Sequence, residues 1–404
     1  MKVLFVMESA APLDYGCAQR NSCLMQNLAQ AGVKVAGVTS PFMEGARVSG
    51  TEIINGLTYH RSQHLNNVKG VSSPPLRWIK RVAMFARYSR LVEQVCLETK
   101  PDLIHAVSSY LNGNAANRVG RKLNIPRLYE IRSLAGSTAA ANDGRPYTDL
   151  RYQAVWRLDK KAMLGATRIA PLSHALQEAL VKRGIPRERM DVVHNAIDTG
   201  HFTPRKRSET VSKRYGLDGC TVIGFIGSVR KIEGLSLLLE AARGILAEHP
   251  AVKVLIVGGG DYLPNLQEQA RSMGIDDRVI FTGRVPHVDV LDYYSVIDIF
   301  AVPRIDAIVN QTVAPLKPIE AMAAQKAVVI SDVGGLVEAV QDQQTGVVFR
   351  AGDAAHLQAK LGDLIKDGTT RARLGMAART WVAENRQWQN MTDRYLGIYQ
   401  AMLQ

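Results

Sequence analysis

Cysteine and long apolar runs are both scarce in this chain, and each absence excludes a class of protein. The four cysteines form no CxxC pair and no metal-ligand spacing, so they are typical of ordinary thiols in a reducing compartment. No apolar run reaches the ~18 residues that a membrane span needs. The opening residues Met1–Glu8 turn polar too soon for a secretory signal. We therefore expect a cytoplasmic protein, for which peripheral attachment to the inner face of the plasma membrane is the membrane mode left open.

Acidic residues are outnumbered by basic ones, and low-complexity tracts are absent. The chain has 50 Lys and Arg against 37 Asp and Glu, a formal net charge of +13. A basic balance favours an anionic partner: nucleic acid, an acidic membrane surface or phosphorylated small molecules. Nucleic acid is the weakest of these, because no recognised binding motif accompanies the charge. The 404 residues, 46% of them hydrophobic, indicate two domains with large cores.

Short apolar runs alternate with helical patterns along the chain, which indicates βαβ units and mostly parallel sheets. The polar, basic stretch Thr203–Lys213 predicts a linker between two doubly wound α/β domains. We expect domains at residues 1–203 and 204–384, an interdomain cleft, and a C-terminal helix at 385–404 that packs back on the first domain. The predicted strands are Val3–Met7, Val33–Thr39, Leu103–Ala106, Arg127–Ile131, Arg168–Pro171 and Asp191–His194, then Val222–Ile226, Lys253–Val257, Val279–Thr282, Ile297–Val302, Ala327–Ser331 and Val347–Phe349.

The segment Ala314–Ala323 carries the strongest functional signal. It follows an apolar run and places two prolines, Lys317 and Glu320 where a helix should begin. The free backbone N–H groups of a helix start suit a phosphate, Lys317 adds a mobile cation, and Glu320 can accept hydrogen bonds from sugar hydroxyls. The segment therefore predicts a nucleotide-diphosphate site. On this segment alone, Glu320 is explained equally well as a favourable acid in the first turn of a helix.

Several further motifs follow one another at characteristic spacing. Together they resemble the retaining glycosyltransferases of family GT4, which have the GT-B fold, over essentially the full length. The likeness is greatest to bacterial exopolysaccharide and cell-surface transferases with a PLKPLEAMA signature. No single motif is specific for this family, but the order and spacing of the whole set are. The motifs are PDLIH at Pro101–His105, NAID at Asn195–Asp198, FIGS at Phe225–Ser228, VGGGD at Val257–Asp261, FTGRV at Phe281–Val285, IEAMA at Ile319–Ala323 and DVGG at Asp332–Gly335.

The resemblance implies a metal-independent hexosyltransferase that retains anomeric configuration. A nucleotide sugar, most often a UDP-sugar with GDP second, would bind the second domain, and a glycan or lipid-linked acceptor the first. No cofactor beyond the donor is implied, and the role would be in surface polysaccharide biosynthesis. Cations and backbone N–H groups would stabilise the leaving diphosphate, whose own oxygen can take the acceptor's proton.

The donor site follows from the same resemblance. Glu320 matches the glutamate that binds the ribose hydroxyls. Lys317, one turn earlier, is a catalytic candidate that would stabilise the diphosphate as a point charge, with a solvated loop lysine as the alternative. The other donor-binding candidates are Gly227, Ser228, Arg230, Lys231, Gly258, Arg284, Val285, Thr312, Val313, Ala314 and Leu316.

One departure from the family concerns the donor sugar. The family usually has a glutamate eight residues before the position of Glu320, where this chain has Thr312. Asn310 and Gln311 are nearby polar substitutes. The change puts the contact with the donor sugar in doubt.

A second departure concerns the phosphates. The family's arginine and lysine of the loop after the first strand of the second domain align with Ser228 and Glu233. Arg230 and Lys231, which lie between them, either supply the missing charge or are ordinary surface cations. We expect Lys317 to take over the diphosphate stabilisation that Ser228 and Glu233 cannot provide.

In the first domain, Arg132 stands where the family has a histidine, and an arginine cannot act as a base. The catalytic hypothesis is that Arg132 acts electrostatically, on the diphosphate or on an acidic sugar, and that Glu130 orients the acceptor. The two lie two residues apart in a strand and so share a face. Gly16, Cys17 and His105 are candidates for the acceptor side or the cleft, although His105 fits a satisfied core histidine at least as well.

The segment Arg77–Arg90 is the most basic amphipathic stretch. Trp78, Val82 and Phe85 fall on one helical side with cations beside them. Such a helix suits an anionic bilayer surface, where each cation contributes about 1 kcal/mol. A core helix with a solvated face fits the pattern equally well. A lipid-linked acceptor would explain a basic face on the acceptor domain.

Two other functions stay open at this point. A non-hydrolysing sugar-nucleotide epimerase shares the two-domain fold, but it needs carboxylates and histidines facing the sugar, and the PIEAMA sequence at 318–323 argues against it. A non-catalytic, nucleotide-sugar-binding homologue of the family is kept open by the departures described above.

Overall fold

The chain forms two compact units. The structure, a computed structural model, describes residues 1–13, 16–41, 43, 50–62, 74–134 and 148–404. The first unit contains the residues up to His194 together with Trp388–Gln404, and the second contains Asn195–Gln387. The division thus falls nine residues earlier than the 203/204 boundary expected from the sequence.

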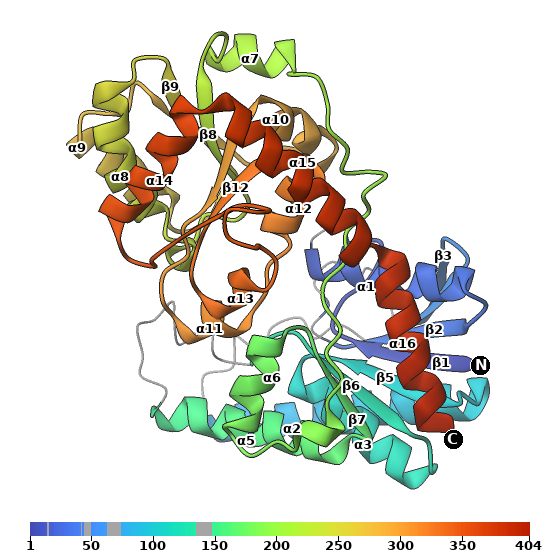
Figure 1. The fold of residues 1–404 in the computed structure, drawn as a ribbon. Coiled ribbons are helices and arrows are strands. Elements are labelled where there is room, and N and C mark those ends of the chain that lie inside the picture. Colours follow the sequence, from blue (N-terminus) through green and yellow to red (C-terminus); the bar gives the residue numbers. More distant parts are fainter. Residues whose placement is uncertain (14–15, 42, 44–49, 63–73, 135–147) are drawn as a thin grey trace. The chain divides into compact units, whose positions relative to one another are not determined.

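The first unit is built on one seven-stranded sheet in the order β3-β4-β2-β1-β5-β6-β7 (Figure 1). All neighbours are parallel except β3 and β4. Strands β1 and β5 are almost wholly buried, as expected for a parallel sheet covered on both faces. The strands are β1 (Lys2–Met7), β2 (Lys34–Thr39), β3 (Gly50–Ile54), β4 (Leu57–Arg61), β5 (Leu103–Val107), β6 (Arg127–Ile131) and β7 (Arg168–Pro171).

Helices complete the first unit, and the last of them comes from the end of the chain. Helix α16 packs on α1 and buries Tyr395 and Tyr399 completely. The helices are α1 (Gly16–Gln30), α2 (Pro74–Thr99), α3 (Tyr110–Lys122), α5 (Leu150–Gly165), α6 (His174–Val181) and α16 (Trp388–Leu403), with a 3-10 turn η1 (Arg187–Arg189).

Two predictions for the first unit need correction. The hairpin of β3 and β4 was not predicted, although its turn residues Asn55 and Gly56 both have positive φ, the pattern of a type I′ turn. The predicted strand Asp191–His194 is not a strand. Its backbone N–H groups at Asp191 and Val193 do bond to β7, but no continuous ladder forms beyond the bridge at Met190.

The second unit contains a six-stranded parallel sheet in the order β10-β9-β8-β11-β12-β13. The chain winds outward from β8 in one direction and then from β11 in the other, so the strand order reverses between these two strands. Ligands of such sheets bind at this reversal, beyond the carboxyl ends of the strands. The strands are β8 (Thr221–Ile226), β9 (Val252–Val257), β10 (Val279–Gly283), β11 (Ile299–Val302), β12 (Ala327–Ser331) and β13 (Val347–Phe349).

Two hydrophobic layers cover the faces of this second sheet. Helices α8, α9 and α14 form one layer, and α10, α12 and α15 the other (Figure 1). The helices and 3-10 turns of this unit are α7 (Glu209–Tyr215), η2 (Lys231–Glu233), α8 (Leu235–Glu248), α9 (Leu263–Ser272), η3 (His287–Asp289), α10 (Val290–Val296), α11 (Ile308–Thr312), α12 (Lys317–Ala323), α13 (Gly334–Val337), α14 (Ala354–Lys366) and α15 (Gly368–Asn385).

The predicted linker Thr203–Lys213 is also corrected, because it belongs to the second unit. Ser208 caps α7 by accepting a hydrogen bond from the backbone of Val211. Val211 is buried in the core, next to the partly buried side chain of Tyr215. A polar composition here indicated a solvated linker, but one face of the short helix, with Val211, Ser212 and Tyr215, is turned inward.

Candidate functional site

The carboxyl edge of the second sheet carries two glycine turns at the strand reversal. Gly227 follows β8 with φ +147°, and Gly258 follows β9 with φ +134°. A Cβ on Gly258 would collide with the carbonyl of Gly227, and a Cβ on Gly227 would collide with the side chain of Lys317. Only glycine allows this conformation and this close approach. The turns therefore hold the backbone tightly beside Lys317.

A buried carboxylate joins two cations at this edge. Glu233, at the end of η2, lies 2.7 Å from the ammonium of Lys317 at the start of α12. It also accepts two hydrogen bonds from Arg304, from Nε at 3.2 Å and Nη2 at 3.1 Å. We call Glu233, Arg304 and Lys317 the Glu233 cluster. Its two cations and one carboxylate leave one positive charge in excess at the point where ligands of this fold bind.

The charges of the Glu233 cluster hold one another in place. Burial alone would raise the pKa of Glu233, but the positive charges of Lys317 and Arg304 lower it to about 2. Burial lowers the pKa of Lys317, an effect that Glu233 opposes. Only one of the three N–H donors of Lys317 is needed for Glu233. The Lys317 side chain is 16% exposed, so it is not fully closed off from solvent.

Glu320 lies three residues after Lys317 on the same helix, α12. Its Oε2 accepts a hydrogen bond of 3.0 Å from the hydroxyl of Tyr294 on α10. Burial raises the pKa of Glu320. Tyr294 thereby fixes Oε2. The other oxygen, Oε1, has no hydrogen-bond donor among the described residues and can accept from a ligand.

The polar residues around Thr312 have structural partners, and their role as substitutes for a donor-binding glutamate stays a prediction. The buried Thr312 donates its hydroxyl to the backbone of Ile308, within its own helix. Asn310 is fully buried, and its amide donates to Ile232 O and Ile305 O. Gln311 braces the loop before α13 through Gly334. Their side-chain bonds hold the loops together.

The remaining predicted donor residues lie along the same edge of the sheet. Ser228, Arg230 and Lys231 are exposed, and neither cation has an ion-pair partner in the described part of the chain. Arg284 is exposed beside Gly259, and Val285 packs on the core. The carbonyl groups of the following loop accept hydrogen bonds that hold its backbone. Val313 O accepts from Arg304, Ala314 O from Asn195 at 2.8 Å, and Leu316 O from Glu320 N.

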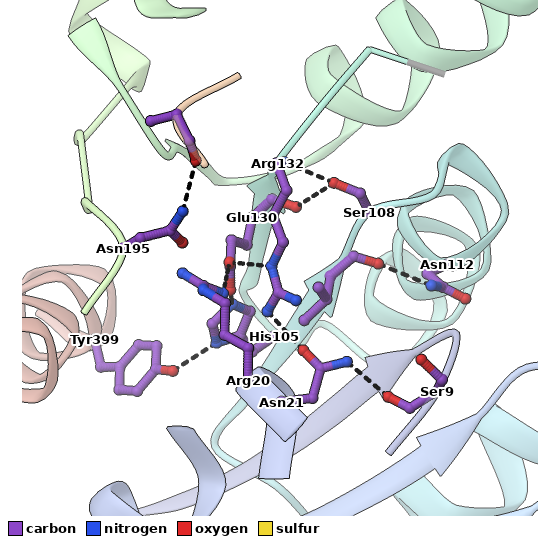
Figure 2. Close-up of polar contacts among 12 residues, drawn as sticks. Ser9, Arg20, Asn21, His105, Ser108, Asn112, Glu130, Arg132, Asn195 and Tyr399 are labelled. Carbon is purple, nitrogen blue, oxygen red and sulfur yellow. Dashed lines mark hydrogen bonds and ion pairs between the residues drawn. The ribbon is translucent and has the colours of Figure 1, made fainter. Parts of the chain in front are cut away.

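A second polar cluster lies in the first unit, centred on Glu130 (Figure 2). Its Oε1 accepts hydrogen bonds from Arg20 Nη1 and, at 2.6 Å, from Arg132 Nε. Its Oε2 lies 3.2 Å from Nε2 of His105. Arg132 also donates from Nη2 to Asn21 Oδ1 at 2.6 Å. We call Glu130, Arg20, Arg132 and His105 the Glu130 cluster.

Two sequence-based roles change with this geometry. Glu130 is 1% exposed, so the expected contact between this carboxylate and an acceptor is not available in this structure, and Glu130 anchors Arg132 instead. His105 is completely buried, so of its two predicted roles the core histidine is the one observed. Gly16 and Cys17 are exposed at the first turn of α1.

The protonation states within the Glu130 cluster follow from burial and charge. Burial alone would raise the pKa of Glu130, but the positive charges of Arg132 and Arg20 hold it well below its usual value. Burial lowers the pKa of His105. At neutral pH Glu130 is therefore ionised and His105 neutral. Nδ1 of His105 lies 2.6 Å from the hydroxyl of Tyr399 and shares a hydrogen bond with it, and the tautomer with its hydrogen on Nε2, the side of Glu130, makes the tyrosine the donor.

Sequence reasoning missed one member of each cluster, Arg304 and Arg20, and two tyrosines that bond to site residues, Tyr294 and Tyr399. Arg304 follows β11 by two residues, and that position at the carboxyl end of a strand was the available signal. Tyr294, Arg20 and Tyr399 gave none, because their partners lie 26 to 294 residues away in the chain. No set of three or more His, Cys, Asp or Glu side chains is placed to hold a metal ion in the described residues.

The basic segment Arg77–Arg90 forms part of α2. The side chains before Val82, including Trp78, lie outside the described residues. Val82 is 48% exposed, whereas Met84 and Tyr88 are buried. The helix thus has an inner face and a solvated face, on which Val82 and Arg87 both lie exposed. None of the helices in the described parts of the chain is long and apolar enough to cross a bilayer.

Comparisons with known proteins agree with this architecture. The family model "Glycosyltransferase Family 4" matches residues 20–201, and the model "Glycosyl transferases group 1" matches residues 208–381. A GDP-mannose-dependent alpha-(1-6)-phosphatidylinositol monomannoside mannosyltransferase of Mycolicibacterium smegmatis is 30% identical over 212 residues, which are 52% of this chain and 56% of that protein.

Two solved structures share the fold. Sucrose-phosphate synthase from Thermosynechococcus elongatus has a TM-score of 0.77 at 19% identity, over 99% of this chain and 98% of the other. HepE from Anabaena, in complex with UDP, has a TM-score of 0.72 at 18% identity, over 99% and 100%. Two doubly wound parallel-sheet units of this kind define a GT-B protein. The chain belongs to the family 4 glycosyltransferases.

Proposed function

We propose that this chain transfers a sugar, with retention of configuration and without a metal, from a nucleotide diphosphate sugar to a glycan or lipid-linked acceptor. The observation that carries the proposal is the Glu233 cluster at the strand reversal of the second unit. One excess positive charge lies there beside two glycine turns and a ribose-type carboxylate, Glu320. This is the chemistry that a nucleoside diphosphate requires.

The chemistry follows from the charge that develops during transfer. As the bond from the sugar to the diphosphate breaks, negative charge grows on the leaving diphosphate and positive charge on the sugar. Lys317 is fixed by Glu233 before the reaction, so it stabilises the leaving group without reorganising. Glu320 would receive the ribose hydroxyls on its free oxygen. The diphosphate oxygen takes the acceptor's proton, so no separate enzymic base is needed.

The proposal names the nucleotide base by preference and the acceptor by class only. UDP is the first choice and GDP the second, and the names of the relatives include both a GDP-mannose-dependent enzyme and a UDP complex. The proposed role is in surface polysaccharide biosynthesis. Arg87 and Arg90, which are exposed on α2, support a peripheral contact with an anionic membrane that presents a lipid-linked acceptor.

A panel of UDP-, GDP- and ADP-sugars with the purified full chain tests this function. We expect one donor to release its free nucleoside diphosphate and the same donor to raise the melting temperature. Conversion of the sugar without release would indicate an epimerase. A melting shift without release or conversion would indicate a non-catalytic binder. No release and no shift with any donor would contradict the proposal.

A further inference from the structure

The first unit repeats the charge arrangement of the Glu233 cluster. In the Glu130 cluster, too, a carboxylate that is almost completely buried is bonded to two cations, Arg20 and Arg132. It also lies at a carboxyl edge, because Arg132 directly follows β6 and Arg20 lies on the helix that follows β1. The sheet of this unit reverses its strand order between β1 and β5. Each unit therefore has a charged cluster at the edge where its fold binds ligands.

The Glu130 cluster also has one positive charge in excess. Arg20 and Arg132 are both charged, Glu130 is ionised, and His105 is neutral in this environment. An uncompensated charge in a partly buried site is costly, and an anion that binds there removes the cost. The imbalance thus favours a negatively charged ligand at the exposed end of the cluster.

Arg132 is the member of the cluster that reaches solvent. Its side chain is 12% exposed, against 5% for Arg20 and 1% for Glu130. Nε and Nη2 bind Glu130 and Asn21, which fix the plane of the guanidinium. Nη1 has no acceptor in the described residues. Figure 2 shows this arginine held between Glu130 and Asn21. A fixed guanidinium with unused donors is suited to the two oxygens of a carboxylate or phosphate.

We propose that the Glu130 cluster is a second anion site, at which Arg132 binds a carboxylate or phosphate carried by the sugar substrate or the acceptor. Glu130 and Asn21 act as positioning residues for it. The inference rests on the proposed function, because it names the chemical class of that reaction's substrate. The anion has two sources: the carboxylate of an acidic sugar, or the phosphate of a lipid-linked acceptor.

Binding measurements that need no turnover test this site. Isothermal titration of the full chain would use methyl glucuronide, glycerol phosphate and the neutral methyl glucoside as probes. We expect one of the anionic probes to bind at least about tenfold more tightly than the glucoside, the effect of one charged hydrogen-bonding group. Preference for the glucuronide identifies an acidic sugar, and preference for glycerol phosphate identifies a phosphate.

Variants separate this site from the donor site. Arg132→Gln should abolish the preference and Arg132→Lys should restore part of it, while both bind UDP or GDP like the wild type. Arg157→Gln, an exposed arginine on α5, is the matched control and should change nothing. Equal affinity of the wild type for all three probes, or an undiminished preference in Arg132→Gln, would overturn the inference. A wild type that prefers the anions but binds no nucleotide would instead contradict the proposed function alone.

Discussion

Glu233 and Lys317 lie 84 residues apart in the chain, yet their charged groups are 2.7 Å apart. Glu233 occupies the position at which the family resemblance places a phosphate-binding lysine, and Lys317 begins α12, the second helix after β11. An unpaired carboxylate at this position would repel a diphosphate. Glu233 is paired with Lys317 and Arg304, so it instead holds the ammonium of Lys317 in place.

Replacing Lys317 by alanine should weaken binding of a nucleoside diphosphate by about ten- to a hundredfold, since one charged donor to phosphate is lost. Binding of the bare nucleoside should stay within about twofold. Isothermal titration of both ligands measures the split. If the affinities for the diphosphate and the nucleoside fall equally, Lys317 supports the structure of the site and does not contact the phosphates. If neither affinity falls, exposed cations such as Arg230 and Lys231 bind the diphosphate instead.

Gly227→Ala should weaken diphosphate binding without removing any charge. The new Cβ would collide with the side chain of Lys317, and φ +147° is strained for alanine, so the ammonium must move. Gly362→Ala in α14 is the control, because a Cβ there meets nothing within 4 Å. Diphosphate affinity of the two variants, measured side by side, checks the effect. Equal affinities would show that the position of Lys317 has no influence on binding.

Glu320→Gln should weaken binding of the nucleoside more than binding of inorganic pyrophosphate. The substitution preserves size but leaves one acceptor oxygen in place of two, so the side chain can no longer accept from Tyr294 on one oxygen and from a ribose hydroxyl on the other. Competition of uridine or guanosine against the diphosphate in the wild type and the variant measures the difference. A loss that is the same for pyrophosphate would move the role of Glu320 from the ribose to the phosphates.

Glu233 should make stability depend on pH in the acid range. Its pKa is about 2 in the folded protein against an ordinary value of 4.5, so the folded state favours the ionised form. The stability gained is present above about pH 4.5 and is lost as the pH falls towards 2, about 3 kcal/mol in total. Urea midpoints of the wild type should therefore fall more steeply below pH 4.5 than those of Glu233→Gln. Parallel curves would contradict the assignment.

Tyr399→Phe should destabilise the first unit by about 1–3 kcal/mol, because Nδ1 of the buried His105 then lacks a donor. Urea unfolding followed by a signal from the first unit measures the loss. The anion preference at Arg132 should also weaken, since the chain of contacts from Tyr399 through His105 to Glu130 is broken at its end. Unchanged stability would mean that the imidazole finds another partner.

The sequence was sufficient for the strands of the two sheets other than β3 and β4, because buried parallel strands appear as short continuous apolar runs. It placed Glu320 and Lys317 together, since both lie on one short helix. It did not reveal the β3–β4 hairpin, whose strands are half exposed.

The partners of the site residues could not be predicted in the same way. Nothing local in the sequence links Glu233 to Arg304, or His105 to Tyr399 on the final helix, because these contacts form only when distant segments pack. Thr312 is a further example. Its place in the motif predicts a ligand contact, and nothing in the sequence indicated that its hydroxyl bonds to the backbone of its own short helix.

The most direct test of the central claim is the structure of the full chain crystallised with UDP or GDP. The account predicts that the diphosphate lies within hydrogen-bond distance of Lys317 Nζ, with the ribose hydroxyls at Glu320. A diphosphate bound away from the Glu233 cluster, with Lys317 still bonded only to Glu233, would contradict it.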